Sequence, residues 1–211
     1  MTRPFCTAFF NLTALTLVAL AAPFERPVGH GLIYFRVREA PADLPAKPPA
    51  RVPACVLDLR YLAGDVPVAE AVEAWLEDRA TTRSPVFVLV NPQTSGPLLA
   101  MLTRFKRGRG VLVVSAAFPG FKPDIAVKTS VEEERRAYEA LEQGAPLASL
   151  LADNPDKVRI DEASLSKDRL AEAAAESVAD AAGGGTAPPP IDLALQRAVH
   201  LHRALLALRK I

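Results

Sequence analysis

The chain has 211 residues, with 25 Lys and Arg against 24 Asp and Glu, and 50% of its residues are hydrophobic. This length suits one domain with room for a helical annex, and the apolar content is enough for a substantial core. The balanced charge argues against a basic surface of the kind that binds nucleic acid or anionic membranes. We therefore expect no nucleic-acid partner and no membrane contact beyond the N-terminal segment.

The first 22 residues form a distinct segment in which Arg3 is the only charged residue. The segment ends in small residues, and Ala19-Leu20-Ala21 fits the A-x-A pattern of a signal-peptide cleavage site. It therefore predicts export to the periplasm or the extracellular space. The alternative is an uncleaved membrane anchor over residues 4–22, since this run is about long enough to span a bilayer.

Apolar strands alternate with helical patterns through the next part of the chain. Short runs rich in β-forming residues predict strands at 31–37, 55–59, 85–90 and 111–114. Apolar residues that recur with helical spacing predict helices over 67–80 and 97–107. Residues 40–53 are rich in Pro and Ala and can form neither a helix nor an inner strand. The alternation favours βαβ units and a mainly parallel sheet, which is an α/β fold.

The second half of the chain predicts a helical annex. Ser130 and Glu133 form a capping-box pattern that opens a charged helix, and an alanine-rich helix is expected over 166–182. The glycines and prolines of 183–190 predict a poorly ordered linker, because burial cannot offset their ordering entropy. We expect three parts after the signal segment: an α/β core at 23–128, a helical insertion with its linker at 129–188, and a closing helix that packs on the core at 189–211.

The turns that follow two of the predicted strands share a pattern with a known protease family. The first turn contains Asp58-Leu59-Arg60 and Gly64, and the second contains Asn91 and Thr94. The pattern resembles the core of the tail-specific (C-terminal processing) serine proteases of the ClpP/crotonase superfamily. In that family the two turns read roughly D-L-R-x-N-x-G-G and N-x-x-T-A-S-x-x-E.

Later residues are also similar to elements of that family. Pro123-Asp124 and Val127 match a P-D-x-x-V element, and Asp192 opens a helix with the spacing of the family's closing helix. The resemblance implies a ClpP/crotonase-like ββα spiral core with a mainly parallel sheet. It also implies that the inserted peptide-binding PDZ module of the family is missing, because only a short connector joins the first strands.

The catalytic residues of the family are replaced in this chain. Gly96 falls at the position of the nucleophilic serine, and Leu99 falls at the position of the glutamate. Ser95, one residue earlier, is expected to be a turn or N-cap serine, with a relocated nucleophile as the alternative. Lys122 is the corresponding candidate base, and it is otherwise a solvated loop lysine.

The oxyanion-binding turn of the family is also altered. Gly64 is retained, but Leu62 replaces an asparagine and Asp65 replaces the second glycine. A carboxylate at Asp65 would lie near the oxyanion position, where it would oppose the stabilisation of a negative charge. Gly64 is therefore the one remaining candidate donor of this turn.

Histidine and cysteine offer little further chemistry. His200 and His202 are two residues apart on the expected closing helix and therefore point to different faces. His202 falls on the apolar stripe of that helix and is expected to be buried at an interface. Cys55 opens a predicted strand and is expected to be a small buried hydrophobic residue. We expect neither a metal site nor a cofactor.

These replacements favour an exported, catalytically degenerate homologue of the tail-specific proteases, which acts as a binding or scaffold protein. Its expected partner is a protein or peptide, and an oligomer is compatible with the superfamily. The first alternative is a serine peptidase with a rewired Ser95–Lys122 dyad. The second alternative is a crotonase-like binder of an acyl thioester.

Overall fold

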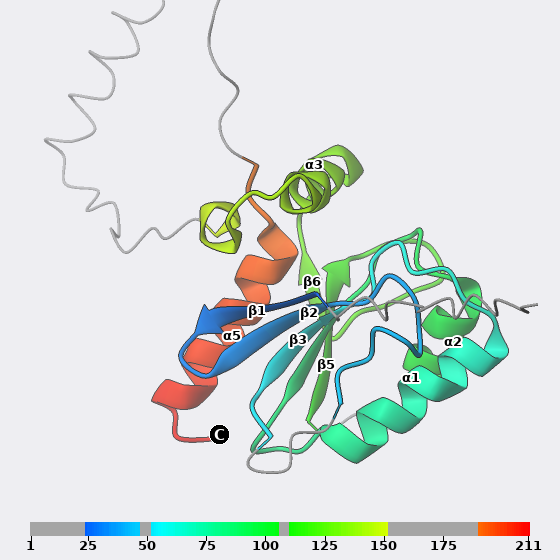
Figure 1. The fold of residues 1–211 in the computed structure, drawn as a ribbon, viewed down its shortest axis with the longest axis horizontal. Helices are drawn as coiled ribbons and strands as arrows, with labels where there is room; N and C mark the ends of the chain where they lie inside the picture. The colour runs from blue at the N-terminus through cyan, green and yellow to red at the C-terminus, as the bar shows by residue number, and fades with distance from the viewer. Residues whose placement is uncertain (1–23, 47–51, 106–109, 152–189) are drawn as a thin grey trace, which may run out of the picture.

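A computed structural model describes residues 24–46, 52–105, 110–151 and 190–211. Within them, six strands form one sheet in the order β1-β2-β3-β4-β5-β6, and helices cover both of its faces (Figure 1). The strands are β1 Phe24–Gly29, β2 Leu32–Arg36, β3 Cys55–Asp58, β4 Val86–Leu89, β5 Val111–Ala116 and β6 Ile125–Val127. The helices are α1 Val66–Arg79, α2 Gly96–Arg104, α3 Val131–Glu142, the 3-10 helix η1 Leu147–Leu150, and α5 Leu193–Ala207.

The prediction of an α/β fold with a mainly parallel sheet is confirmed. The four predicted strands correspond to β2, β3, β4 and β5, and the two predicted helices correspond to α1 and α2. Strands β2 to β6 pair in parallel, whereas β1 pairs antiparallel to β2. The hairpin between β1 and β2 turns at His30 and Gly31, whose φ angles are 52° and 75°. Positive φ at both central residues is typical of hairpin turns that match the strand twist.

Each parallel strand lies beside the strand that precedes it in the chain. When successive crossover connections have the same handedness and each adds the next strand on the same side, their helices lie on the same face of the sheet. Helices α1 and α2, which connect β3 to β4 and β4 to β5, do lie together on one face (Figure 1). Helix α5 lies on the opposite face, and α3 lies near the carboxyl ends of the strands.

The central strands are buried on both faces. Because side chains alternate along a strand, Cys55 and Leu57 pack on the side of α1 and α2, and Val56 packs on the side of α5. The same alternation along β4 places Val88 in the first core and Phe87 in the second. Continuous apolar strand sequences are expected when helices cover both faces.

The capping box predicted at the start of the annex is confirmed. The Ser130 hydroxyl oxygen accepts a hydrogen bond from the Glu133 backbone N–H at 3.2 Å, and the Ser130 N–H donates to Glu133 Oε2 at 2.9 Å. These two bonds satisfy donors that the first turn of α3 would otherwise leave free. The second expected annex helix, its linker and the N-terminal segment 1–22 lie outside the described residues.

The expected closing helix corresponds to α5, which buries Leu195, Ala198 and Val199 against the second core. Asp192 caps it, since its carboxylate accepts a hydrogen bond from the Leu195 N–H at 3.0 Å. Among the helices of the described ranges, none combines the length and the apolar character that a membrane crossing requires.

Candidate functional site

The turns that follow β3 and β4 lie side by side at the carboxyl edge of the sheet. The Ser95 N–H donates a hydrogen bond to the Leu62 carbonyl at 3.0 Å, and the Thr94 hydroxyl donates to the Leu59 carbonyl at 3.0 Å. The carboxyl edge of parallel strands is where α/β proteins commonly bind ligands. The two turns that the sequence pattern singles out therefore form one local structure at this edge.

Asn91 and Thr94 hold the second turn together. The Asn91 side-chain oxygen accepts hydrogen bonds from the N–H groups of Gln93 and Thr94, at 3.2 and 3.0 Å, and from the Tyr61 N–H of the first turn at 3.2 Å. The Asn91 N–H in turn donates to the Thr94 hydroxyl at 3.1 Å. Both side chains are buried. Their residue types are explained by these backbone contacts, which are characteristic of Asx turns.

Ser95 is the N-cap residue of α2, and Gly96 is the first residue of this helix. The Ser95 hydroxyl is buried and has no hydrogen-bond partner among the described residues. Pro97 is the second helical residue. It has no N–H from which the side chain of an N-cap residue could accept a hydrogen bond. Gly96 is exposed, and a Cβ atom there would meet no atom within 4 Å.

Lys122 and Ser95 make no hydrogen bond to each other through the Ser95 hydroxyl, because that hydroxyl has no partner within the described ranges. The Lys122 side chain is exposed, on the segment between β5 and β6. A lysine that acts as a general base at neutral pH needs a buried environment. The structure therefore does not join the two residues into a dyad.

Gly64 and Asp65 both serve the start of α1. A Cβ atom at Gly64 would lie 2.5 Å from Val68 Cγ1, so close packing of the turn against the helix explains the glycine. Asp65 is exposed, and its carboxylate accepts a hydrogen bond from the Val68 N–H at 3.2 Å. The carboxylate that the sequence suggested near an oxyanion position is therefore engaged in capping α1.

A buried ionic cluster lies behind these turns. The Arg60 guanidinium makes two-point contacts with two carboxylates, at 2.9 and 2.6 Å to Asp58 and at 3.2 and 2.7 Å to Asp192. Side-chain exposure is 0% for Arg60 and Asp58 and 2% for Asp192. Burial alone would raise the pKa of Asp58, but Arg60, with help from Arg36 and Tyr34, lowers it below its usual range.

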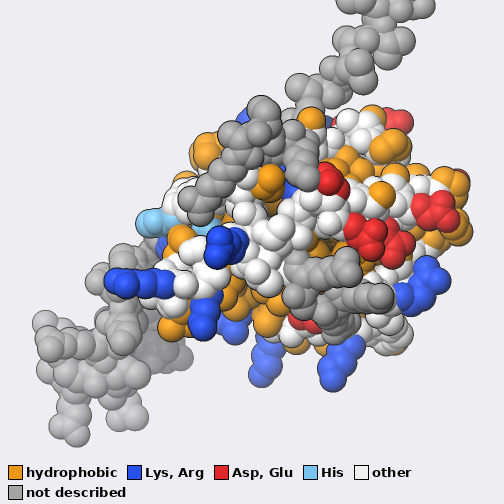
Figure 2. Space-filling view, turned by 90° about the horizontal axis from the view of Figure 1, so that it is seen from below, with side chains coloured by type: hydrophobic (Ala, Val, Ile, Leu, Met, Phe, Trp, Pro, Cys, Tyr) orange, Lys and Arg blue, Asp and Glu red, His pale blue; other side chains and the backbone are white. Residues whose placement is uncertain are grey.

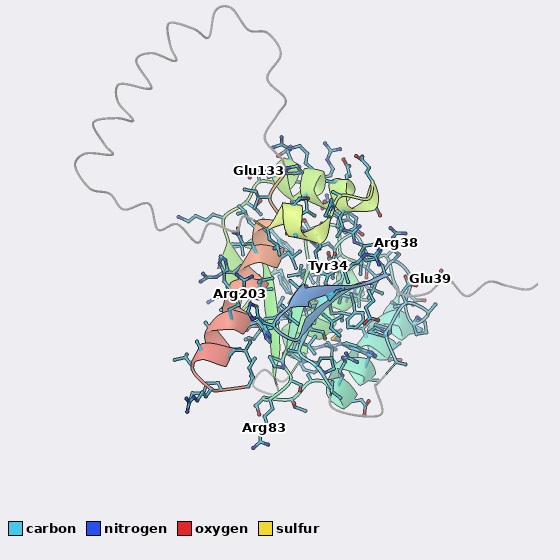
Figure 3. The ribbon with its side chains drawn as sticks, turned by 60° about the vertical axis from the view of Figure 1, so that its left-hand side comes forward. Tyr34, Arg38, Glu39, Arg83, Glu133 and Arg203 are labelled. Atoms are coloured by element: carbon cyan, nitrogen blue, oxygen red, sulfur yellow. The ribbon has the colours of Figure 1, made fainter. Side chains whose placement is uncertain are left out.

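Two further buried side chains extend this cluster toward α3. The Tyr34 hydroxyl donates to Asp58 Oδ2 at 2.6 Å, and Arg36 Nε donates to the Tyr34 oxygen at 3.2 Å. The Arg36 guanidinium lies 3.8 Å from the centre of the Tyr138 ring of α3. Burial, reinforced by Asp58, raises the pKa of Tyr34 well above its usual value. Figure 3 shows Tyr34 in the interior between α3 and the strands, whereas Glu133 lies at the outer side of α3. The cluster joins β2, β3, α3 and α5 and is closed to solvent.

Glu134 of α3 is a buried carboxyl group that contacts the second turn. The Asn91 side-chain NH₂ donates to Glu134 Oε1 at 2.8 Å, and Glu134 is 6% exposed. Burial raises the pKa of Glu134, although Arg60 and the hydrogen bond from Asn91 oppose the increase. Glu134 also lines a cavity of about 110 Å³ at the carboxyl edge. No motif in the sequence singles out Glu134, although its spacing from Ala137, Tyr138 and Leu141 places it on the buried face of α3.

His30 and His202 lie at the opposite, amino edge of the sheet. His202 is buried, with Nε2 3.0 Å from the His30 carbonyl oxygen and its ring edge-on to Phe87, as expected for an interface histidine. His200 is exposed and lies elsewhere on α5. A cavity of about 330 Å³ at this edge is lined by His30, His202 and Arg83, and Arg83 projects away from the body in Figure 3. Within the described ranges, no three His, Cys, Asp or Glu side chains are grouped to hold a metal ion.

Cys55 is buried, as the sequence suggests, and burial raises the pKa of its thiol to about 11. A thiol with such a pKa is protonated at neutral pH and is a poor nucleophile.

No family model, no curated protein and no solved structure matches the chain. The geometry of the carboxyl edge is therefore the main guide to function.

Proposed function

We propose that this protein is a non-catalytic relative of the tail-specific serine proteases that binds a protein or peptide at the carboxyl edge of its sheet. The sequential order of parallel strands, with α1 and α2 on one face, is compatible with a ClpP/crotonase-like spiral. The adjacency of the Asp58-Leu59-Arg60 turn and the Asn91-x-x-Thr94 turn also supports this relationship.

The observation that carries the proposal is the environment of the Ser95 hydroxyl. This hydroxyl is buried without a hydrogen-bond partner among the described residues, and the candidate base Lys122 is exposed. An activated serine needs a base within hydrogen-bond reach. Gly96 at the family's serine position provides no hydroxyl at all. The edge therefore retains the turns of the family's fold without the groups that cleave a peptide bond.

The proposal places the protein outside the cytoplasm, on the strength of the signal-peptide pattern at Ala19-Leu20-Ala21. Membrane anchoring through residues 4–22 is the alternative arrangement. The charged surface is mixed: Figure 2 shows acidic side chains gathered on the side of α1 and basic side chains toward α5. Such a surface suits a protein partner or a second copy of the chain better than it suits a polyanion.

The test compares the mature protein with its Ser95→Ala and Gly96→Ser variants on unstructured protein substrates that have free apolar C-termini. We expect no turnover by any of the three, and no labelling of Ser95 by a fluorophosphonate probe. An active tail-specific protease assayed in parallel controls for substrate quality. Turnover by the wild type that is lost in Ser95→Ala would overturn the proposal and establish the rewired Ser95–Lys122 dyad instead.

A further inference from the structure

Glu134 is the one charged residue among the described residues that line the cavity of about 110 Å³ at the carboxyl edge. The other lining residues are apolar or hydroxyl-bearing, and they come from the ends of β4 and β5 and from the start of α3; among them are Pro92, Ala116, Phe118 and Ser130. Among the described residues that line the cavity, none is Lys or Arg. A group that enters this cavity therefore meets Glu134 without a competing cation from this part of the wall.

The carboxyl of Glu134 is held in one orientation. The Asn91 NH₂ group donates to Oε1 at 2.8 Å, and Asn91 is itself fixed through its side-chain oxygen by three backbone N–H groups. This hydrogen bond occupies Oε1, so Oε2 is the oxygen that would accept from a ligand. A group whose orientation is set before binding does not pay the entropy of ordering on binding. The side chain is thus preorganised to accept a hydrogen bond from a ligand.

The charges behind Glu134 do not neutralise it. Arg60 is the cation that favours the charged form of Glu134, but its guanidinium is engaged by both Asp58 and Asp192. These two carboxylates also act on Glu134, and they disfavour a further negative charge. An anionic ligand would therefore be repelled, and a purely apolar ligand would leave the carboxyl without a partner.

We propose that this cavity binds a primary ammonium group of a protein or peptide partner. The group belongs either to a lysine side chain or to the N-terminus of that partner. The ammonium would donate to Glu134 Oε2, and the ring of Phe118 in the cavity wall would add a favourable cation–π contact. One carboxylate oxygen can pair a single donor of an ammonium, whereas the five N–H donors of a guanidinium would need more acceptors than this carboxyl offers. This inference rests on the proposed binding function, because it names the chemistry that the same edge recognises.

Two probe molecules distinguish whether the cavity prefers the ammonium of a lysine side chain or that of an N-terminus. Nα-acetyl-lysine methylamide carries the ammonium on a side chain, and alaninamide carries it at an N-terminus. Nα-acetyl-norleucine methylamide has a similar apolar chain without the charge and is the matched control ligand. The full-length mature protein, labelled with ¹⁵N, is titrated with each probe, and the Asn91 side-chain NH₂ resonances report binding at Glu134. We expect saturable shifts with at least one ammonium probe and none with the norleucine probe.

The variants test whether Glu134 is responsible. Glu134→Gln keeps an oxygen for Asn91 but removes the charge, and we expect the affinity for the ammonium probe to fall roughly tenfold or more. Glu132→Gln removes the same formal charge from an exposed position on the same turn and is expected to leave the affinity unchanged. Equal shifts with the norleucine probe, unchanged affinity in Glu134→Gln, or no binding of either ammonium probe would each overturn the inference. Peptidase turnover would overturn the proposed function, and that assay is separate from this titration.

Discussion

Replacing Asp192 with alanine should destabilise the protein more than the loss of a helix cap can explain. Asp192 has two roles, because its carboxylate pairs with the fully buried Arg60 and also caps α5 through the Leu195 N–H. Removing one partner of a buried ion pair costs about 3–5 kcal/mol. Since Arg60 retains Asp58, the lower end of this range applies, and the lost cap adds about 1 kcal/mol.

The expected loss for Asp192→Ala is therefore about 4 kcal/mol of unfolding free energy, or roughly 8–16 °C in melting temperature for a domain of this size. Asp192→Asn keeps a capping oxygen and should lose about 3 kcal/mol. Asp65→Ala is the matched control, because Asp65 caps α1 from an exposed position without an ion pair. It should lose only about 1 kcal/mol.

Urea denaturation at neutral pH, followed by circular dichroism, measures the three differences. Equal losses of unfolding free energy in Asp192→Ala and Asp65→Ala would show that the buried ion pair contributes nothing measurable to stability. A change in the denaturant slope of a variant would show instead that its unfolded or native ensemble differs, and the comparison would then use calorimetry.

Three further outcomes are expected. Gly64→Ala should be destabilised by the contact with Val68, and Val68→Ala in the same chain should recover part of the loss, as measured by thermal melting. Gly96→Ala should be neutral or slightly stabilising, because the new Cβ meets nothing and the unfolded chain loses freedom; a clear loss in melting temperature would contradict this. The folded-state pKa of Glu134 is raised, so the folded state holds its proton more tightly and unfolding free energy falls as pH rises through that pKa. Relative to wild type, Glu134→Gln should therefore gain stability between about pH 4 and neutral pH, and a pH-independent difference in urea titrations would argue against this.

The parallel core could be predicted from the sequence because its strands are buried on both faces. Residues 85–90 form a continuous apolar run, and such runs are typical of strands covered by helices on both sides. Strand β1 could not be predicted in this way, because Pro27 interrupts it and its residues are mostly exposed. Strand β6 has three residues, too few for a period to be visible.

The candidate site could be predicted only in part, because much of it depends on contacts between distant residues. The turn pattern located Asp58, Arg60 and Asn91, but their partners lie far along the chain. Asp192 is separated from Arg60 by 132 residues, and Glu134 is separated from Asn91 by 43. Local sequence pattern carries no information on such pairings, although a buried arginine in a turn indicates that a carboxylate must reach it.

The two edge strands limit the ways in which copies of this protein can meet. A sheet edge that offers a long row of free N–H and C=O groups can recruit another strand and extend the sheet. At one edge β1 carries Pro27, which has no N–H to donate, beside the charged Glu25 and Arg26. At the other edge β6 is only three residues long. Within the described residues, neither edge offers the long row of donors and acceptors that sheet extension needs, so contacts between copies through this part of the chain would use its helices and loops rather than a continuous intermolecular sheet.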